Sequence, residues 1–282
     1  MLAVWLYYEF KIAKHPMIPK ELFLGQKVVG LSFAVAGIAG ANFFSLLNFW
    51  PLTIATVWDP IPVQIGLRGL PAGFATASGA IFWNGMLSVW KGGARWILIL
   101  AAIILTCFGG ALGTMTPENE WQTVALSAIA CFGLGGLIVP AATIAIIAAP
   151  DALITTCAAL SLSVRAVGGA IGYSIYYNVF ANKLKEKIPT LVATYAIEAG
   201  LPLADAKTFV TTFLTVPAEA ASLPGVTPAI LAGALRGSQW AYAESLHYVW
   251  FTSIAFGVLS IIAAAFLPNT RRFETNRIAV AL

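Results

Sequence analysis

The stretch "LSLSVRAVGGAIGYSIYY", residues 160–177, joins a long apolar run to one arginine near its middle and a glycine pair three residues later. Arg165 is the only charged residue between positions 152 and 181. About 20 apolar residues suffice to cross a bilayer as a helix, so 152–181 is predicted to span one. Because a central arginine costs about 2.5–3.5 kcal/mol in hydrocarbon, Arg165 must face protein or water.

The composition of the whole chain also indicates a protein that lies in a lipid bilayer. Of 282 residues, 59% are hydrophobic and 10% are charged, whereas a soluble domain carries about 25% charged residues. The mean hydropathy of +0.84 indicates more apolar surface than the core of one soluble domain can bury. The sequence therefore predicts an all-α membrane protein whose first partner is the lipid bilayer.

Several classes of function are excluded by what the chain lacks. The net charge of +4 is not gathered into a dense basic block, which argues against a nucleic-acid partner. The three cysteines lie in apolar runs and are expected to be buried thiols, so neither a metal site nor a cofactor is predicted. No hydrolase, zinc or phosphate-binding motif occurs, and we expect a protein that is not an enzyme.

Six segments are long enough to cross the membrane, and together they predict a six-helix bundle over 28–267. The predicted spans are about 28–50, 63–90, 95–115, 121–148, 152–181 and 246–267. Residues 182–245 are predicted to be an outer loop carrying short helices over the outer mouth. One is "PLADAKTFVTTFL" (202–214), and another is "TPAILAGAL" (227–235), with Thr227 as its N-cap and Pro228 in its first turn.

Basic residues predict the orientation. Lysines precede the first span, Lys91 and Arg95 lie in the turn between the second and third spans, and three arginines lie in the tail, 268–282. The short loops 51–61 and 116–120 hold neither lysine nor arginine. Both termini are therefore expected in the cytoplasm of a multi-pass protein, most simply in the plasma membrane. Three lysines that follow the fifth span oppose this orientation, but charges in long loops have little influence on orientation.

Polar side chains gather on the first, second, fourth and fifth spans, whereas the middles of the third and sixth are aliphatic and aromatic. We expect the first group to line a polar cavity and the other two spans to face lipid, although a simple helical bundle could show the same pattern. The candidates for a substrate pathway are Asn42, Asn48, Asn84, Arg165, Tyr173 and Tyr176. For Arg165, a structural role against a neighbouring helix remains an equal alternative. Small residues such as Gly168 and Gly172 predict close helix packing.

The motifs also resemble a known family. The segments "LPAGFATASGAIF" (70–82), "KGGARW" (91–96), "PDALITTCAALSLSVRAVGGAIGYSIYYNVF" (150–180) and the last 46 residues, from "GSQWAYAESLHYVW" to "TNRIAVAL", are similar to fungal major facilitator transporters. Among these, the chain most resembles the trichothecene efflux pumps, which overlap the siderophore transporters of the fourteen-span drug antiporter class.

The resemblance implies a major facilitator fold, of which this chain would form the C-terminal half. Residues 1–27 would then be the end of a linker helix and a cytoplasmic loop, and a six-span N-terminal half would be the missing partner. It implies efflux of small amphipathic molecules, such as mycotoxins, drugs or siderophores, by proton antiport in the full-length protein. The alternative is a truncated half-transporter that does not transport.

Overall fold

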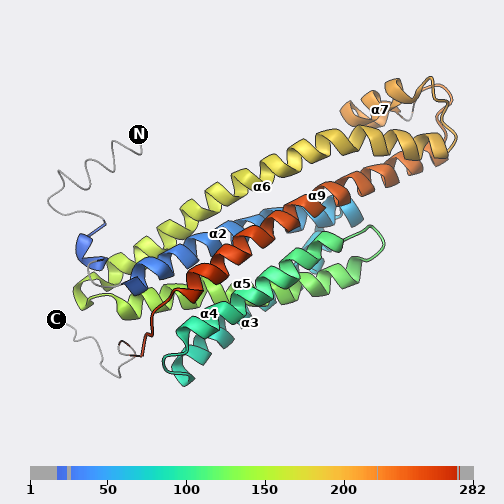
Figure 1. Ribbon diagram of the computed structural model, residues 1–282. Helices are drawn as coiled ribbons and strands as arrows, with labels where there is room; N and C mark the ends of the chain where they lie inside the picture. The colour runs from blue at the N-terminus through green and yellow to red at the C-terminus, as the bar shows by residue number, and fades with distance from the viewer. Residues whose placement is uncertain (1–17, 24–26, 221, 272, 274–282) are drawn as a thin grey trace.

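The computed structural model describes residues 18–23, 27–220, 222–271 and 273, and within them it contains helices and no strand (Figure 1). Six long helices form the body. They are α2 (Lys27–Thr53), α3 (Pro62–Val89), α4 (Ala94–Ala111), α5 (Glu120–Ala148), α6 (Ile154–Glu198) and α9 (Pro228–Ala265). Short pieces join them: η1 (Lys20–Leu22), η2 (Ile54–Trp58), η3 (Leu112–Thr114), η4 (Asp151–Leu153), α7 (Ala206–Thr215) and α8 (Pro217–Ala220). The predicted all-α fold class is confirmed.

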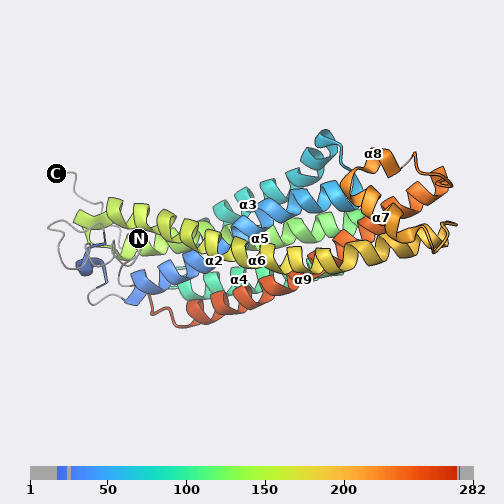
Figure 2. The ribbon, with the colours of Figure 1, turned by 90° about the horizontal axis from the view of Figure 1, so that it is seen from above.

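The long helices lie roughly parallel or antiparallel to one another (Figure 2). Helix α5 packs against α3, α4 and α2, while α9 packs against α6, α4 and α2. Helix α3 has its main contact with α5 alone, so it forms one edge of the bundle. One apolar core runs through all of these helices.

Five of the described helices are long and apolar enough to cross a membrane. The matching segments are Lys27–Trp58, Ala94–Thr114, Glu120–Ala148, Asp151–Glu198 and Pro228–Ala265. Helix α3 is 28 residues long and is not among them, because five glycines and several hydroxyl side chains lower its hydropathy. That α3 is the second of six spans stays a prediction.

Helices α6 and α9 are much longer than the predicted spans. Helix α6 does not end at 181 but continues to Glu198, and α9 begins at Pro228 rather than at 246. At 1.5 Å per residue, the 45 residues of α6 extend about 68 Å, whereas the hydrocarbon core is about 30 Å thick. Most of 182–245 is therefore not a loop but a continuation of two helices. Leucine, lysine, glutamate and alanine favour a helix whether or not the segment is apolar.

The two extensions run side by side to the far end of the molecule, where α7 joins them (Figure 1). A second small core holds this end together, with Val192, Phe209 and Ile230 at its centre. The predicted cap of α9 is confirmed, because the Thr227 hydroxyl accepts the N–H of Ile230 at 3.4 Å and Pro228 opens the helix. We call this the cap end, and we call the opposite end, with the 91–93 turn and residues 268–271, the basic end.

Two predicted segments lie largely outside the described residues. The predicted linker-helix end falls in 1–17, and most of the predicted tail falls in 272 and 274–282. The boundaries proposed for these two segments therefore stay predictions.

Small residues bring α2 and α6 together, as their spacing predicted. A methyl group added at Gly168 would meet the backbone of Gly37, and one added at Gly172 would meet Ala41. Without side chains at these positions the two helix backbones can approach closely, which is how helices pack in lipid.

Candidate substrate groove

An apolar groove lies between α2 and α3, with α5 as its floor. Its volume is about 370 Å³, which is within the range of small-molecule sites. The lining residues are Phe43, Leu46, Leu47, Trp50 and Pro51 from α2, Gly69, Ala72, Gly73 and Thr76 from α3, and Cys131 and Leu134 from α5.

The sequence shapes this groove through glycine. Gly69 and Gly73 lie one helical turn apart on α3, and a methyl group added at either position would meet no atom within 4 Å. Larger side chains there would occupy the space between α3 and α2. The groove therefore exists partly because α3 presents no side chain at two of its positions.

The groove offers few polar atoms, as expected of a site for amphipathic molecules. The Thr76 hydroxyl donates to the Ala72 carbonyl at 2.8 Å and also has a side-chain hydrogen bond with Cys131 of α5. Trp50 is 5% exposed, and its indole N–H is buried and finds no acceptor among the described residues. A buried donor without a partner costs about 1–3 kcal/mol, so a bound oxygen that reached it would be stabilised.

Two of the predicted pathway residues lie in the interior instead of lining a cavity. The Tyr176 hydroxyl donates to Asn42 Oδ1 at 2.8 Å, and both side chains are buried, at 0% and 2% exposure. This hydrogen bond joins α6 to α2, next to the Gly172–Ala41 contact. We therefore assign Asn42 and Tyr176 to helix packing and leave them out of the proposed pathway.

Two other predicted residues, Asn48 and Tyr173, are exposed at the surface of the bundle. Asn48 is exposed beside Leu47 of the groove, and its side-chain amide donates to the Phe44 carbonyl of its own helix at 2.7 Å. Tyr173 is 37% exposed and packs its ring on Phe49, with the centroids 5.9 Å apart.

Arg165 is half-buried, and its contacts bear on the structural alternative. Its backbone and the stem of its side chain lie where a methyl group at Gly40 would be, so this residue packs α6 onto α2. Its guanidinium makes no hydrogen bond or ion pair with any described residue, so the stem is structural and the charged head is free for another partner.

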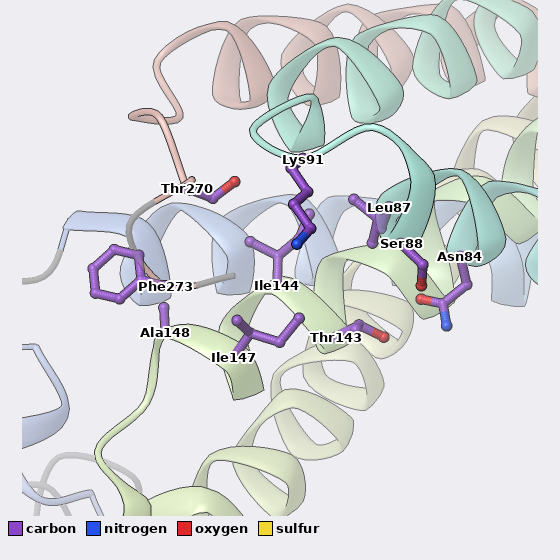
Figure 3. Close-up of a pocket in the computed structure, with 10 residues that line it drawn as sticks. All are labelled: Asn84, Leu87, Ser88, Lys91, Thr143, Ile144, Ile147, Ala148, Thr270 and Phe273. Carbon is purple, nitrogen blue, oxygen red and sulfur yellow. The ribbon is translucent and has the colours of Figure 1, made fainter. Parts of the chain in front are cut away.

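Asn84 is not part of the groove. It lies eight residues beyond Thr76 on α3, about 12 Å along the helix, and lines a separate pocket at the basic end (Figure 3). The structure thus does not gather the six predicted residues into one site.

Arg68, on α3, forms ion pairs that were not predicted from the sequence. Its guanidinium bonds Glu120, at the start of α5, and pairs with Asp59 at 3.6 Å. With 13% of its side chain exposed, Arg68 ties the two acidic loops of the cap end to α3. The sequence holds one indication of these ion pairs. Both short loops, 51–61 and 116–120, are acidic, and Arg68 lies about two turns inside the helix that follows the first of them.

The comparisons with known proteins agree with this architecture. The model of the fungal trichothecene efflux pump family (TRI12) matches residues 1–282. The chain is 26% identical to the MFS-type transporter prx5 of Penicillium rubens, with 96% of this chain and 50% of the relative covered. It is 20% identical to the trichothecene efflux pump TRI12 of Fusarium sporotrichioides, with 98% of this chain and 47% of the relative covered.

The chain thus spans about half the length of these relatives. The family and the named relatives are transporters rather than enzymes, and apolar helices of membrane-spanning length agree with that. The match over all 282 residues shows that this chain belongs to the fungal trichothecene efflux pump family of major facilitator transporters.

Proposed function

We propose that this chain is the C-terminal bundle of an efflux transporter that exports small amphipathic molecules, mycotoxins among them, by proton antiport. The observation that carries the proposal is the apolar groove between α2 and α3, which has only a few polar atoms on its walls. Alternating access would rock this bundle against a complementary bundle, around a cavity to which the groove contributes. The basic end would face the cytoplasm and the cap end the outside.

The coverage of half of each relative supports a complementary bundle as partner. The free guanidinium of Arg165 and the exposed Tyr173 are the side chains we place nearest that partner or the water between the two bundles. On its own, the chain is expected to bind amphipathic molecules without exporting them. A half that never transports is the alternative, and the export experiment below separates the two.

Filling the groove tests its role. Gly73→Leu places a side chain in the groove without striking the backbone, because no atom lies within 4 Å of the added carbon. Gly66→Leu is the matched control, since Gly66 is equally open on the same helix but does not line the groove. We expect Gly73→Leu to weaken binding of a radiolabelled trichothecene and of rhodamine 6G to the purified chain by about tenfold. The control should bind within about twofold of the parent.

Export is tested in a yeast strain without its own drug pumps. Cells that make this chain together with the N-terminal bundle of a relative should accumulate less rhodamine 6G than cells that make either alone, and a protonophore should abolish the difference. Proton-dependent export by this chain as a monomer would overturn the need for a second bundle. Equal loss of ligand binding in the two leucine variants would overturn the groove as the binding site.

A further inference from the structure

A second pocket, of about 250 Å³, lies at the basic end between α3, α5 and the segment that follows α9 (Figure 3). Its polar lining comes from Asn84, Ser88 and Lys91 on or just after α3, from Thr143 on α5 and from Thr270 after α9, and Phe273 closes one side. Nothing in the proposed transport cycle uses this pocket. It lies at the far end of α3 from the groove.

Two hydrogen-bond donors at the pocket, Lys91 and Ser88, are exposed and have no partner within the described part of the chain. The Lys91 side chain extends from its turn into the pocket, and its ammonium lies above Ile144 (Figure 3). The polar atoms of Asn84, Ser88 and Thr143 lie on the other side of the pocket. Neither Lys91 nor Ser88 makes a hydrogen bond or ion pair with any residue that the structure describes. An ammonium that faces a hydroxyl across the pocket suits an anion with several oxygen atoms.

Acceptors are present as well. Asn84 Oδ1 is buried and has no hydrogen-bond partner within the described part of the chain. The Thr143 hydroxyl donates to the Val139 carbonyl at 3.1 Å, so its oxygen is left to accept. An anion that is acceptor-only, such as a bare sulfate, would leave these two oxygens unsatisfied. A ligand that carries both a phosphate and hydroxyl groups would satisfy them.

Apart from Thr270, the rest of the lining is apolar. Leu87 and Ile144 are buried, and Ile147 is 41% exposed at the edge of the pocket. An acyl chain that leaves the pocket along Ile147 would contact an apolar side chain rather than water. Charged and hydroxyl-binding atoms inside, with an apolar side chain at the rim, match the order of groups in a phospholipid.

We propose that this pocket binds the headgroup of an anionic phospholipid in which a phosphate carries a hydroxyl-rich substituent, as in phosphatidylinositol. Lys91 and Ser88 would donate to the phosphate oxygens, and Asn84 Oδ1 and Thr143 would accept from the hydroxyls. Anionic lipids are concentrated in the cytoplasmic leaflet, so the lipid source rests on the orientation in the proposed function. The phosphate chemistry does not depend on that orientation.

The test uses the purified 282-residue chain in detergent and native mass spectrometry. Phosphatidylinositol is titrated against phosphatidylcholine with the same acyl chains, and inositol 1-phosphate serves as the soluble arm. We expect at least about tenfold tighter binding of phosphatidylinositol than of phosphatidylcholine. We expect inositol 1-phosphate to bind more weakly than the lipid, because it lacks the chain that would contact Ile147.

Two charge-removing variants at the same end separate a site from general attraction. Lys91→Gln should weaken phosphatidylinositol binding by about tenfold, and Lys91→Arg should restore most of it. Arg95→Gln removes the same charge four residues away, at a side chain that is exposed and does not line the pocket, and should change binding by less than about twofold. Circular dichroism and the thermal midpoint of each variant check that the bundle is folded.

Equal losses in Lys91→Gln and Arg95→Gln, with both variants folded, would overturn the proposal, as would equal binding of the two lipids. Inositol 1-phosphate that binds as tightly as the lipid, with the same dependence on Lys91, would keep the phosphate chemistry and overturn the lipid source. Because the assay involves neither transport nor a complementary bundle, its failure leaves the proposed efflux function standing, and the reverse also holds.

Discussion

At the scale of single residues, the polar side chains of the spans divide between packing and surface. Asn42 and Tyr176 are 134 positions apart in the chain, and yet they share a buried hydrogen bond of 2.8 Å. A polar residue in an apolar span looks the same in sequence whether it meets another helix or a wetted cavity. Which of the two surrounds the residue depends on the helix that packs next to it, and no local sequence pattern specifies which residue will lie opposite.

Removal of the Tyr176 hydroxyl tests this packing role. Tyr176→Phe leaves Asn42 Oδ1 buried without its partner, so we expect a loss of about 1 kcal/mol in the free energy of unfolding. Tyr177→Phe is the control, because Tyr177 is 52% exposed and forms no hydrogen bond among the described residues. Thermal unfolding of the two variants in detergent measures the difference. A smaller effect at Tyr176 than at Tyr177 would contradict the assignment.

Arg165 and Arg68 show where residue-level prediction succeeds and fails. Arg165 stood out because it is the only charge in a long apolar run, and the structure shows its stem packed on Gly40. Arg68 was passed over because it lies nearer the end of its segment, where a charge is unremarkable. Its pairing with Glu120 depends on a turn of chain 52 residues away, which the sequence does not place.

At the scale of helices, apolar runs predicted α2, α4 and α5 well, since their whole length is hydrophobic. The same apolar runs underestimated the lengths of α6 and α9, because hydropathy identifies the apolar part of a helix and not its full length. The groove was not predictable, since it arises from missing side chains at Gly69 and Gly73 opposite a wall that α2 supplies.

The close contact of the α6 and α9 extensions can be broken at one glycine. A side chain at Gly237 would strike the Leu191 carbonyl, 2.7 Å from the first added carbon, and the backbone of Val192. We expect Gly237→Leu to separate the extensions and to raise amide hydrogen exchange in α7 by about tenfold or more. Ala232→Leu, at an exposed position on the same helix, should leave exchange unchanged. Protection of α7 that is equal in the two variants would show that the extensions do not support it.

At the scale of the whole molecule, the long helices form one bundle with a basic end and a cap end. Lys91 and Arg95 lie at the basic end, and Glu118 lies at the other, where it bonds Arg236 of α9 at 2.8 Å. If α3 crosses the membrane along with the five more apolar helices, the 51–61 loop and the 91–95 turn lie on opposite sides of it. If α3 does not cross, they lie on the same side. The 91–95 turn and the tail share one compartment in either case, because the four helices α4, α5, α6 and α9 lie between them.

The position of these segments relative to the membrane is therefore the measurement that tests the central claim most directly. In a background with its three cysteines changed to alanine, single cysteines are placed at Ile61, Arg95, Glu118, Lys185 and Arg271, all exposed. A membrane-impermeant maleimide applied to intact yeast should label positions 61, 118 and 185, and label 95 and 271 only after permeabilisation. Labelling that places 61 and 95 on the same side of the membrane, or 95 and 271 on opposite sides, would contradict the six-span bundle and the transporter built on it.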